Sequence, residues 1–461
     1  MMALFRTRLV GPCLLAALSA GVAPMAAPVV RAEVSGDSER QEYWAKVETR
    51  DWAAAAESAE TLVGAARTAG EPLALARALT MLGNAQLGAG NLTAAEAAFL
   101  EALTLVEHNG RPMSEELLEP LRGLGYTLAE AGRHAEAVVV LERAVKATHR
   151  SIGLFDASQE TVLKKLADSL LRLGRLYEAR QHMAYLMRVG ERAYGENDPR
   201  RVSVLLSYAD WNAATGDMRA ARDAYRLAIE LVEDVYGSDS PALVEPLCGL
   251  AHSYLLELYL GPLGMLEGRE PPVVGGANVI AEERPMNPRH LPGEGQRAVE
   301  RAVQIAEASD PPREDLLLRA LLEAGDWHQV KTDTHRALEY YRRAWHVAQT
   351  RQAAQAGTYA ANARAVLAHP VQIYYPTPPL AARHLGRPPE DVIERYVEVQ
   401  FTVTSDGSVS DEQVISRDST RRQAAEALQA IRAARYRPRF VDGEPVDTPG
   451  MTRREIFRVR K

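Results

Sequence analysis

The stretch "GNLTAAEAAFLEAL", residues 90–103, decides the fold because similar stretches return along the chain at a fixed interval. Each begins with a glycine 42 residues after the previous one, and these glycines are Gly90, Gly132, Gly174 and Gly216. A second apolar pattern precedes each glycine and carries a small residue seven positions upstream of it. The small residues are Gly83, Gly125, Ala167 and Ala209, with Ala251 and Gly325 in the later copies. A helix pair of this size cannot bury its own apolar face, so the interval predicts hairpins stacked into a curved solenoid.

The copies resemble the tetratricopeptide repeat (TPR) family. In the third copy, the positions that carry the resemblance are Ala167, Gly174, Leu176, Ala179, Met183 and Leu186. The last copy departs from the pattern, because Thr332 and Thr334 replace the usual glycine and aromatic residue. The 42-residue interval is similar to the longer form of the repeat in kinesin light chain. The resemblance implies a mainly α protein whose superhelical solenoid has about six to seven helical hairpins, over residues 40–369.

Two segments depart from the regular repeat. Residues 42–63 are typical of a divergent first hairpin, in which we expect Trp44 and Trp52 to cap the stack. A segment at about 258–293 interrupts a later hairpin, and its proline and glycine density excludes a continuous helix. Such an insertion is either a functional loop or tolerated disorder, and we expect a loop folded back on the solenoid.

Residues 1–32 have the features of a targeting segment. Arg6 and Arg8 precede an uncharged run rich in Leu and Ala, and residues 30–32 fit the small-residue rule for a cleavage site. These features predict a cleaved signal peptide and a periplasmic protein. The alternative is a retained inner-membrane anchor that faces the periplasm, because the uncharged run is long enough to cross a bilayer. Cleavage would leave Cys248 as a lone cysteine, which we interpret as a buried apolar residue rather than a reactive thiol.

The pattern changes after the last repeat. Residues 370–392 are rich in proline and predict a semi-rigid linker. The next segment, "YVEVQFTV" at residues 396–403, alternates apolar and polar residues as a half-buried strand does, and "SDGS" then supplies a turn. We expect a second strand, a helix with Asp418 or Ser419 at its N-cap, and a closing strand "REIFRV".

This order of elements resembles the TonB C-terminal domain. The resemblance rests on "VEVQFTVTSDGSV" at 397–409 and "YRPRFVDGEPV" at 436–446, and it covers residues 393–461. It implies a small α+β domain that binds by adding a partner strand to the edge of its sheet. In transducers of this family the partner strand is a segment of an outer-membrane receptor. The alternative is a small packing or dimerisation domain without a receptor contact.

The sequence gives no positive sign of catalysis. It contains no His-Glu-x-x-His, Cys-x-x-Cys, phosphate-binding glycine loop or nucleophile elbow. We therefore expect no enzymatic activity, no cofactor and no metal, although four histidines follow one another at positions 328, 335, 346 and 369. The formal net charge of −7 argues against a nucleic-acid partner.

These patterns predict a non-catalytic periplasmic scaffold or adaptor that binds protein or peptide partners of the cell envelope. The solenoid groove and the C-terminal sheet edge are the expected binding surfaces. A TonB-like energy transducer, which couples the inner membrane to outer-membrane receptor transport, is the first alternative and needs a retained anchor. An enzyme with no recognisable motif is the second. The candidate partner-binding residues are Tyr126, Tyr208 and Tyr254 on inner helices, and Arg454, Ile456, Phe457 and Val459 on the closing strand.

Overall fold

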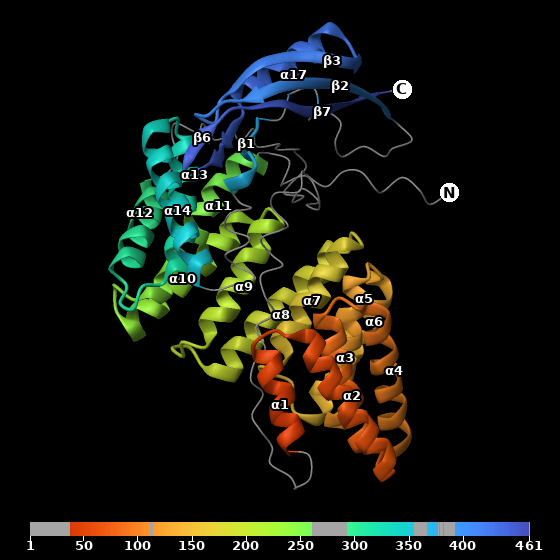
Figure 1. The fold of residues 1–461 in the computed structure, drawn as a ribbon. Coiled ribbons are helices and arrows are strands. Elements are labelled where there is room, and N and C mark those ends of the chain that lie inside the picture. Colours follow the sequence, from red (N-terminus) through yellow and green to blue (C-terminus); the bar gives the residue numbers. More distant parts are fainter. Residues whose placement is uncertain are drawn as a thin grey trace, which may run out of the picture. The chain divides into compact units, whose positions relative to one another are not determined.

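A computed structural model describes residues 37–110, 114–260, 293–354, 367–376, 378, 381 and 392–460 (Figure 1). The predicted signal peptide and nearly all of the predicted insertion therefore lie outside the described residues. The chain divides between Val204 and Leu205 into two compact units, and each is described by itself. Within the described ranges, no helix is both long and apolar enough to cross a membrane.

The first unit is a stack of helices in which each helix contacts the next one in sequence. Alternate helices also touch, because α5 contacts both α3 and α7. These two kinds of contact are typical of stacked helical hairpins. The elements are α1 (Asp37–Glu48), α2 (Trp52–Ala69), α3 (Pro72–Gly88), α4 (Leu92–Asn109), η1 (Glu115–Leu117), α5 (Leu118–Glu130), α6 (His134–Ser151), α7 (Gln159–Arg172) and α8 (Leu176–Tyr194).

The second unit continues the helical repeat and then changes to strands. Its helices again contact their sequence neighbours from α10 to α14, and α11 also contacts α13. The helix pair α11 and α12 packs together although residues 261–292 separate the two helices. The helical elements are α9 (Arg201–Ala214), within which the two units meet in sequence, α10 (Met218–Tyr236), η2 (Pro241–Leu243), α11 (Val244–Leu260), α12 (Gly293–Ala308), α13 (Glu314–Val330) and α14 (Thr334–Ala354).

The turn inside a hairpin depends on a residue in the left-handed conformation. The glycines that start the repeated stretches, at positions 90, 132, 174 and 216, have φ angles between 75° and 86°. Glycine adopts this conformation without the steric cost that a side chain brings. Thr332 holds the same place in the last hairpin with a φ of 64°, so the turn from α13 to α14 forms without glycine.

The small residues upstream of these turns lie where the two helices of a hairpin cross. A Cβ atom added to Gly83 would lie 2.7 Å from the Phe99 ring, and one added to Gly325 would lie 2.2 Å from the Tyr341 ring. Both distances are shorter than real carbon contacts, so only glycine permits this approach of the helices. The solenoid fold class predicted from the repeat is therefore confirmed.

The first hairpin differs in one detail from the prediction. Trp44 was expected to cap the stack, but its side chain is 51% exposed, so this expectation is wrong. The preceding residue, Tyr43, is buried instead and donates a hydrogen bond of 3.0 Å to the carbonyl oxygen of Met81. Trp52 is half-buried and packs closely against Gly88. Helix α1 thus packs through Tyr43, the neighbour of the predicted Trp44.

The terminal domain is built on an antiparallel sheet of three strands in the order β3-β2-β7. Two further strand pairs, β1 with β4 and β5 with β6, are also antiparallel. The elements are β1 (Val371–Tyr374), β2 (Val392–Val403), β3 (Val409–Asp418), α17 (Arg421–Ala433), β4 (Arg435–Arg437), β5 (Arg439–Val441), β6 (Glu444–Val446) and β7 (Thr448–Arg460).

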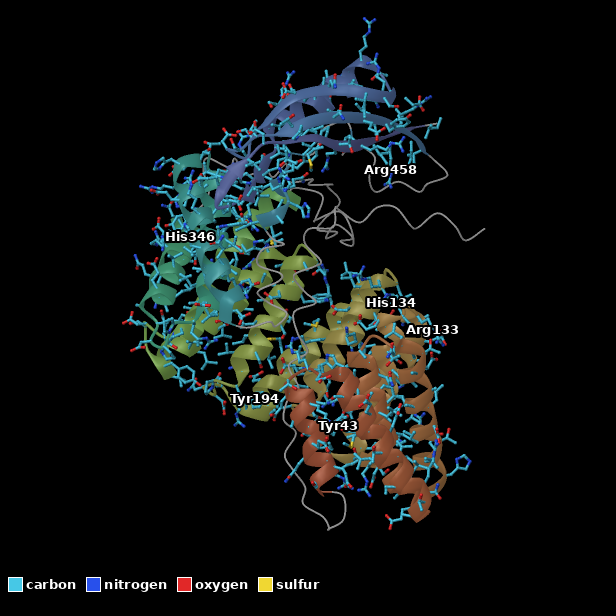
Figure 2. All side chains as sticks on the ribbon, viewed as in Figure 1. Tyr43, Arg133, His134, Tyr194, His346 and Arg458 are labelled. Carbon is cyan, nitrogen blue, oxygen red and sulfur yellow. The ribbon has the colours of Figure 1, made fainter. Side chains whose placement is uncertain are left out.

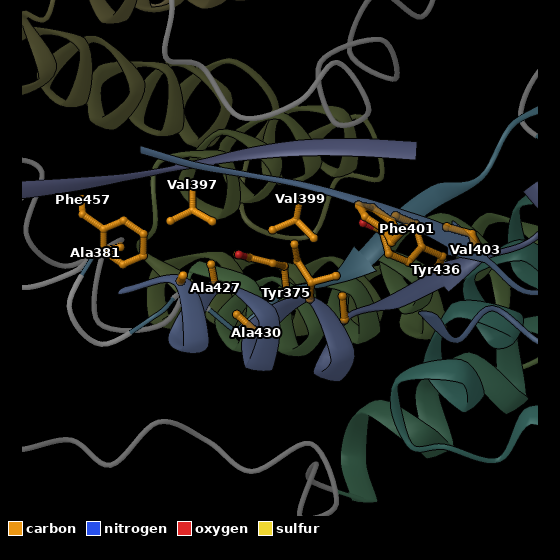
Figure 3. Close-up of a cluster of buried hydrophobic side chains, with 13 residues drawn as sticks. Tyr375, Ala381, Val397, Val399, Phe401, Val403, Ala427, Ala430, Tyr436 and Phe457 are labelled. Atoms are coloured by element: carbon orange, nitrogen blue, oxygen red, sulfur yellow. The ribbon is translucent and has the colours of Figure 1, made fainter. Parts of the chain in front are cut away.

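One face of the three-stranded sheet and helix α17 enclose the core of this domain (Figure 3). The alternating residues of β2 supply one side of the core, and α17 supplies small side chains such as Ala427. Tyr375, which was expected in the linker, is buried in this core, and β1 just before it pairs with β4. Part of the segment predicted as a linker therefore belongs to the terminal fold; the rest of it lies largely outside the described residues.

Helix α17 begins one residue later than expected. Its N-cap is Thr420, and neither Asp418 nor Ser419 has this role. The Thr420 hydroxyl accepts a hydrogen bond from the backbone N–H of Gln423, and the Gln423 side chain accepts one from the backbone N–H of Thr420. This reciprocal arrangement is a capping box, which satisfies two backbone donors at once.

Replacing Thr420 with alanine is expected to lower the free energy of unfolding of the terminal domain by about 1 kcal/mol, because the first turn of α17 loses an acceptor. Thermal or urea unfolding followed by circular dichroism would measure the change. Thr420→Ser keeps a hydroxyl at the same position and is expected to retain most of the stability. Equal losses in both variants would contradict the capping role.

Candidate interaction surfaces

Strand β7 is an edge strand of the three-stranded sheet. On one side it pairs with β2, from the Val392–Arg460 pair to the Val403–Thr448 pair. On its other side, no strand of the described ranges pairs with it. Along this side the backbone of β7 has no strand partner in the described ranges, and such an edge can take up an added strand.

Strand β3 is the opposite edge, but it is less regular. Its pairing with β2 contains two register shifts, and Asp411 has a positive φ angle of 55°. Bulges of this kind twist an edge strand and hinder the addition of another strand. In the β2–β7 ladder the pairing runs without a shift from Arg460 to Met451. The regular edge of the sheet is thus the one formed by β7.

The side chains of β7 divide between the two faces of the sheet. Phe457 is fully buried in the domain core, whereas Arg454 and Val459 are exposed and Ile456 is half-buried. The Arg454 guanidinium lies 3.9 Å from the centre of the Tyr396 ring on the neighbouring strand. Three of the four predicted residues of this strand are therefore accessible at least in part, and Phe457 holds the strand in place from inside.

The accessible part of β7 is basic. Arg454 and Arg458 lie on the same face of the strand. Arg458, which is labelled in Figure 2, forms an ion pair with Glu394, with 3.4 Å between Nε and Oε1. Arg453 points to the other face, where its guanidinium lies 3.6 Å from the Tyr375 ring centre. It also donates a hydrogen bond of 2.8 Å to Gln372. The terminal domain thus ties β1 to its edge strand through Arg453.

The three candidate tyrosines of the solenoid differ in their surroundings. Tyr126 on α5 and Tyr208 on α9 are half-buried. Burial raises the pKa of Tyr126 to about 12, so its hydroxyl stays neutral. Tyr254 on α11 is only 4% exposed; its hydroxyl donates to Glu294 and its ring lies 3.8 Å from the Arg222 guanidinium. Tyr254 is therefore part of the packed interior, and the partner-binding role of the set stays a prediction.

A further surface escaped the sequence analysis. Asp326 of α13 is buried and forms an ion pair with Arg437 of β4, so the last helical hairpin holds the terminal domain. One sequence signal points to it: Asp326 lies in the run "LLEAGDWHQV", where a charged residue interrupts a buried helix face. Buried charges are normally paired, so this aspartate implies a cationic partner elsewhere in the chain.

Among the described residues, no group of three or more His, Cys, Asp or Glu side chains is in position to hold a metal ion. Cys248 is buried, and burial raises the pKa of its thiol to about 12, which keeps it a poor nucleophile. His328 is also buried, and burial lowers its pKa.

His252 of α11 has the opposite pKa shift. Burial alone would lower its pKa, but Glu323 of α13, whose Oε1 lies 3.1 Å from His252 Nδ1, more than offsets this effect with a smaller contribution from Asp326. The pKa of His252 is therefore raised above its usual value of 6.5. The folded chain holds this proton more tightly than the unfolded chain does.

We expect the contact between His252 and Glu323 to stabilise the fold fully below about pH 6.5 and to weaken as the pH rises through the higher folded pKa. The difference in free energy of unfolding between the natural chain and Glu323→Gln should accordingly be larger at about pH 6 than at about pH 9. Urea unfolding at several pH values measures this difference. The contributions of the other histidines are the same in both proteins and cancel in this difference. A difference that does not change with pH would therefore contradict the raised pKa of His252.

Comparisons with known proteins agree with this architecture. Family models for the tetratricopeptide repeat match residues 76–107 and 158–234. The model described as the Gram-negative bacterial TonB protein C-terminal domain matches residues 391–458. A search of curated proteins returned no match.

Solved structures similar to this chain include BtubC from P. vanneervenii, with 16% sequence identity and a TM-score of 0.38 over 66% of this chain and 93% of that one. A putative kinesin light chain from Podosopora anserina has TPR-like repeats; it shares 15% identity, with a TM-score of 0.39 over 44% of this chain and 96% of its own. A tetratricopeptide repeat protein from Parabacteroides merdae shares 14% identity, with a TM-score of 0.39 over 68% and 92% of the two chains.

Tetratricopeptide repeats and TonB C-terminal domains are families of non-catalytic interaction scaffolds. The repeat matches fall on helices α3, α4 and α7 to α10, and the terminal match runs from the residue before β2 into β7. The chain therefore carries tetratricopeptide repeats followed by a TonB C-terminal domain.

Proposed function

We propose that this protein is a non-catalytic periplasmic adaptor whose β7 edge takes up an extended segment of a partner protein. The observation that carries the proposal is the regular edge of β7, which pairs with no second strand of the described ranges, on a domain with its own core. An added strand gains main-chain hydrogen bonds along such an edge, and side chains at alternate positions select the partner. The repeats supply a second surface for protein or peptide partners of the cell envelope.

Site-specific photo-crosslinking in the native host tests the mode of binding. A photoreactive amino acid would replace Arg454, Ile456 or Arg458 in turn, because these three alternate positions lie along the proposed edge. If a partner strand adds to β7, the three probes attach to one partner peptide at sites about two residues apart, as strand geometry requires. Mass spectrometry of the crosslinked peptides measures this spacing.

A probe at Gln413, which is exposed on the opposite edge strand β3, serves as the matched control. Crosslinks at scattered positions of several proteins, or the same peptide captured from Gln413, would reject strand addition at β7. Deletion of residues 393–461 is not a suitable control, because the last helical hairpin contacts this domain.

A second candidate is an energy transducer, and the match of residues 391–458 to the TonB C-terminal domain favours it. This function requires that the N-terminal segment stays attached and anchors the chain in the inner membrane. The intact mass of the protein from its native host separates the candidates. A mass without the first 32 residues or so supports the adaptor. A full-length mass in the membrane fraction supports the transducer.

A further inference from the structure

The last helical hairpin presents a polar site that the terminal domain fills. The guanidinium of Arg437 donates two hydrogen bonds to the Asp326 carboxylate, Nε to Oδ1 at 3.0 Å and Nη2 to Oδ2 at 2.6 Å. The hydroxyl of Tyr341 donates to the same Oδ1 at 2.8 Å, and the Tyr341 ring centre lies 5.8 Å from the guanidinium. Both charged side chains are more than nine-tenths buried. This fork geometry fits arginine and would not fit lysine equally well.

A second contact lies on the same helix one turn further along. Gln329 of α13 is fully buried, and its Nε2 donates a hydrogen bond of 2.6 Å to the backbone carbonyl of Asp406. Asp406 belongs to the turn that joins β2 to β3. The next residue, Gly407, accepts a hydrogen bond of 2.9 Å from the backbone N–H of Tyr436. The turn is thus held between the helix and the strand that carries Arg437.

Aromatic rings surround this polar centre, and an exposed ion pair lies at its border. Phe440 of β5 stacks on Trp345 of α14, with ring centres 6.2 Å apart, and meets the edge of the Tyr341 ring at 6.3 Å. Arg342 of α14 pairs with Glu444 of β6 at 3.0 Å, and both side chains are exposed. Strand β1 also contacts α11 and α13. A buried polar centre, aromatic side chains around it and a solvent-exposed polar border are typical of a specific interface.

The charges explain why this interface has one register. A buried ion pair adds little net stability, but a wrong pairing leaves both charges buried and unpaired. Sliding the terminal domain along α13 would separate Arg437 from Asp326 and Gln329 from Asp406. The aromatic contacts alone would tolerate such a shift more easily, because apolar contact is not directional.

We propose that the last repeat carries a guanidinium-binding site, made of Asp326 and Tyr341 and flanked by Gln329 and Trp345, and that the chain fills it with its own Arg437. The terminal domain therefore binds to the last repeat in one register, and this binding does not use the β7 edge. While Arg437 is bound, the face of α13 that carries Asp326 and Gln329 is not accessible to other proteins. This proposal does not depend on what β7 binds.

Crosslinking across the exposed border reports the docked state. In a Cys13→Ser background, Arg342→Cys and Glu444→Cys place two thiols at the border, and a short bismaleimide joins them when the domain is docked. Cys248 is buried and does not compete. We expect rapid crosslinking with the natural site. Arg437→Gln, Arg437→Lys and Asp326→Asn should each slow it at least about tenfold, as loss of a buried charged contact predicts.

Arg435→Gln is the matched control, because Arg435 lies on the same strand and its side chain donates hydrogen bonds to backbone carbonyls of its own domain. It should crosslink as fast as the natural chain. Equal rates for Arg437→Gln and Arg435→Gln would overturn the proposal. Hydrogen exchange of β2 and β7 in Arg437→Gln completes the test: protected amides support docking of a folded domain, and lost protection overturns it in favour of one inseparable fold.

Discussion

Gly407→Ala is expected to lower the free energy of unfolding by roughly 2–5 kcal/mol, the largest effect of any single methyl group that we predict for the terminal domain. Two causes add up at this position. The backbone has a φ of 77°, which disfavours a side chain, and a Cβ atom would lie 2.1 Å from the carbonyl oxygen of Tyr436. It would also lie 2.2 Å from Nε2 of Gln329. Urea unfolding followed by circular dichroism measures the loss.

Gly450→Ala separates these two causes. Gly450 has nearly the same φ, 74°, but nothing lies within 4 Å of an added Cβ atom. This variant should therefore lose only the backbone contribution, about 1–2 kcal/mol. Equal losses in the two variants would mean that neither Tyr436 nor Gln329 crowds the turn. A larger loss at Gly407 would support the close approach of these two residues to the turn.

Gly325→Ala is expected to destabilise the last hairpin by about 1–3 kcal/mol, although alanine is the better helix former. The added Cβ atom would lie 2.2 Å from the ring of Tyr341. That ring cannot move aside easily, because it is fully buried and its hydroxyl is bonded to Asp326. Thermal unfolding of the full chain measures the effect.

The matched control is Gly64→Ala in α2. Gly64 is also inside a helix, but nothing lies within 4 Å of an added Cβ atom. The same substitution should there stabilise the chain by about 0.5–1 kcal/mol, because alanine loses less backbone entropy on folding. Opposite signs at the two glycines are the expected result. If Gly325→Ala also stabilised the protein, this result would contradict the close approach of α13 and α14 at Gly325.

The solenoid was predictable because its information is local. Each repeat places its glycine, its small residue and its bulky residue within one hairpin, so a fixed interval is enough to find them. The same local reasoning led to Trp44 instead of Tyr43, because the two aromatic residues are neighbours in the first helix. Which of two neighbours faces inward depends on the phase of the helix against α2, and a short divergent pattern does not fix that phase.

The strands were predictable and their surroundings were not. Alternation placed β2, and the resemblance indicated the closing strand, but neither shows that β1 pairs with β4 or that Phe457 is buried. The pairing of Asp326 with Arg437 joins residues that are 111 positions apart. No spacing rule connects them, so only the unusual aspartate on a buried helix face hinted at a partner.

The docked terminal domain restricts where repeats can be added to or removed from the array. A repeat array exposes an apolar face at each end and needs a terminal element to cover it. Here Phe440 and Arg437 cover the aromatic and acidic side chains of the final hairpin. The hairpin of α13 and α14 is therefore fixed in place as the terminal one, and α11 in the hairpin before it also contacts strand β1 of the domain. We expect related chains to gain or lose repeats ahead of α11 and to keep the last two hairpins together with the domain.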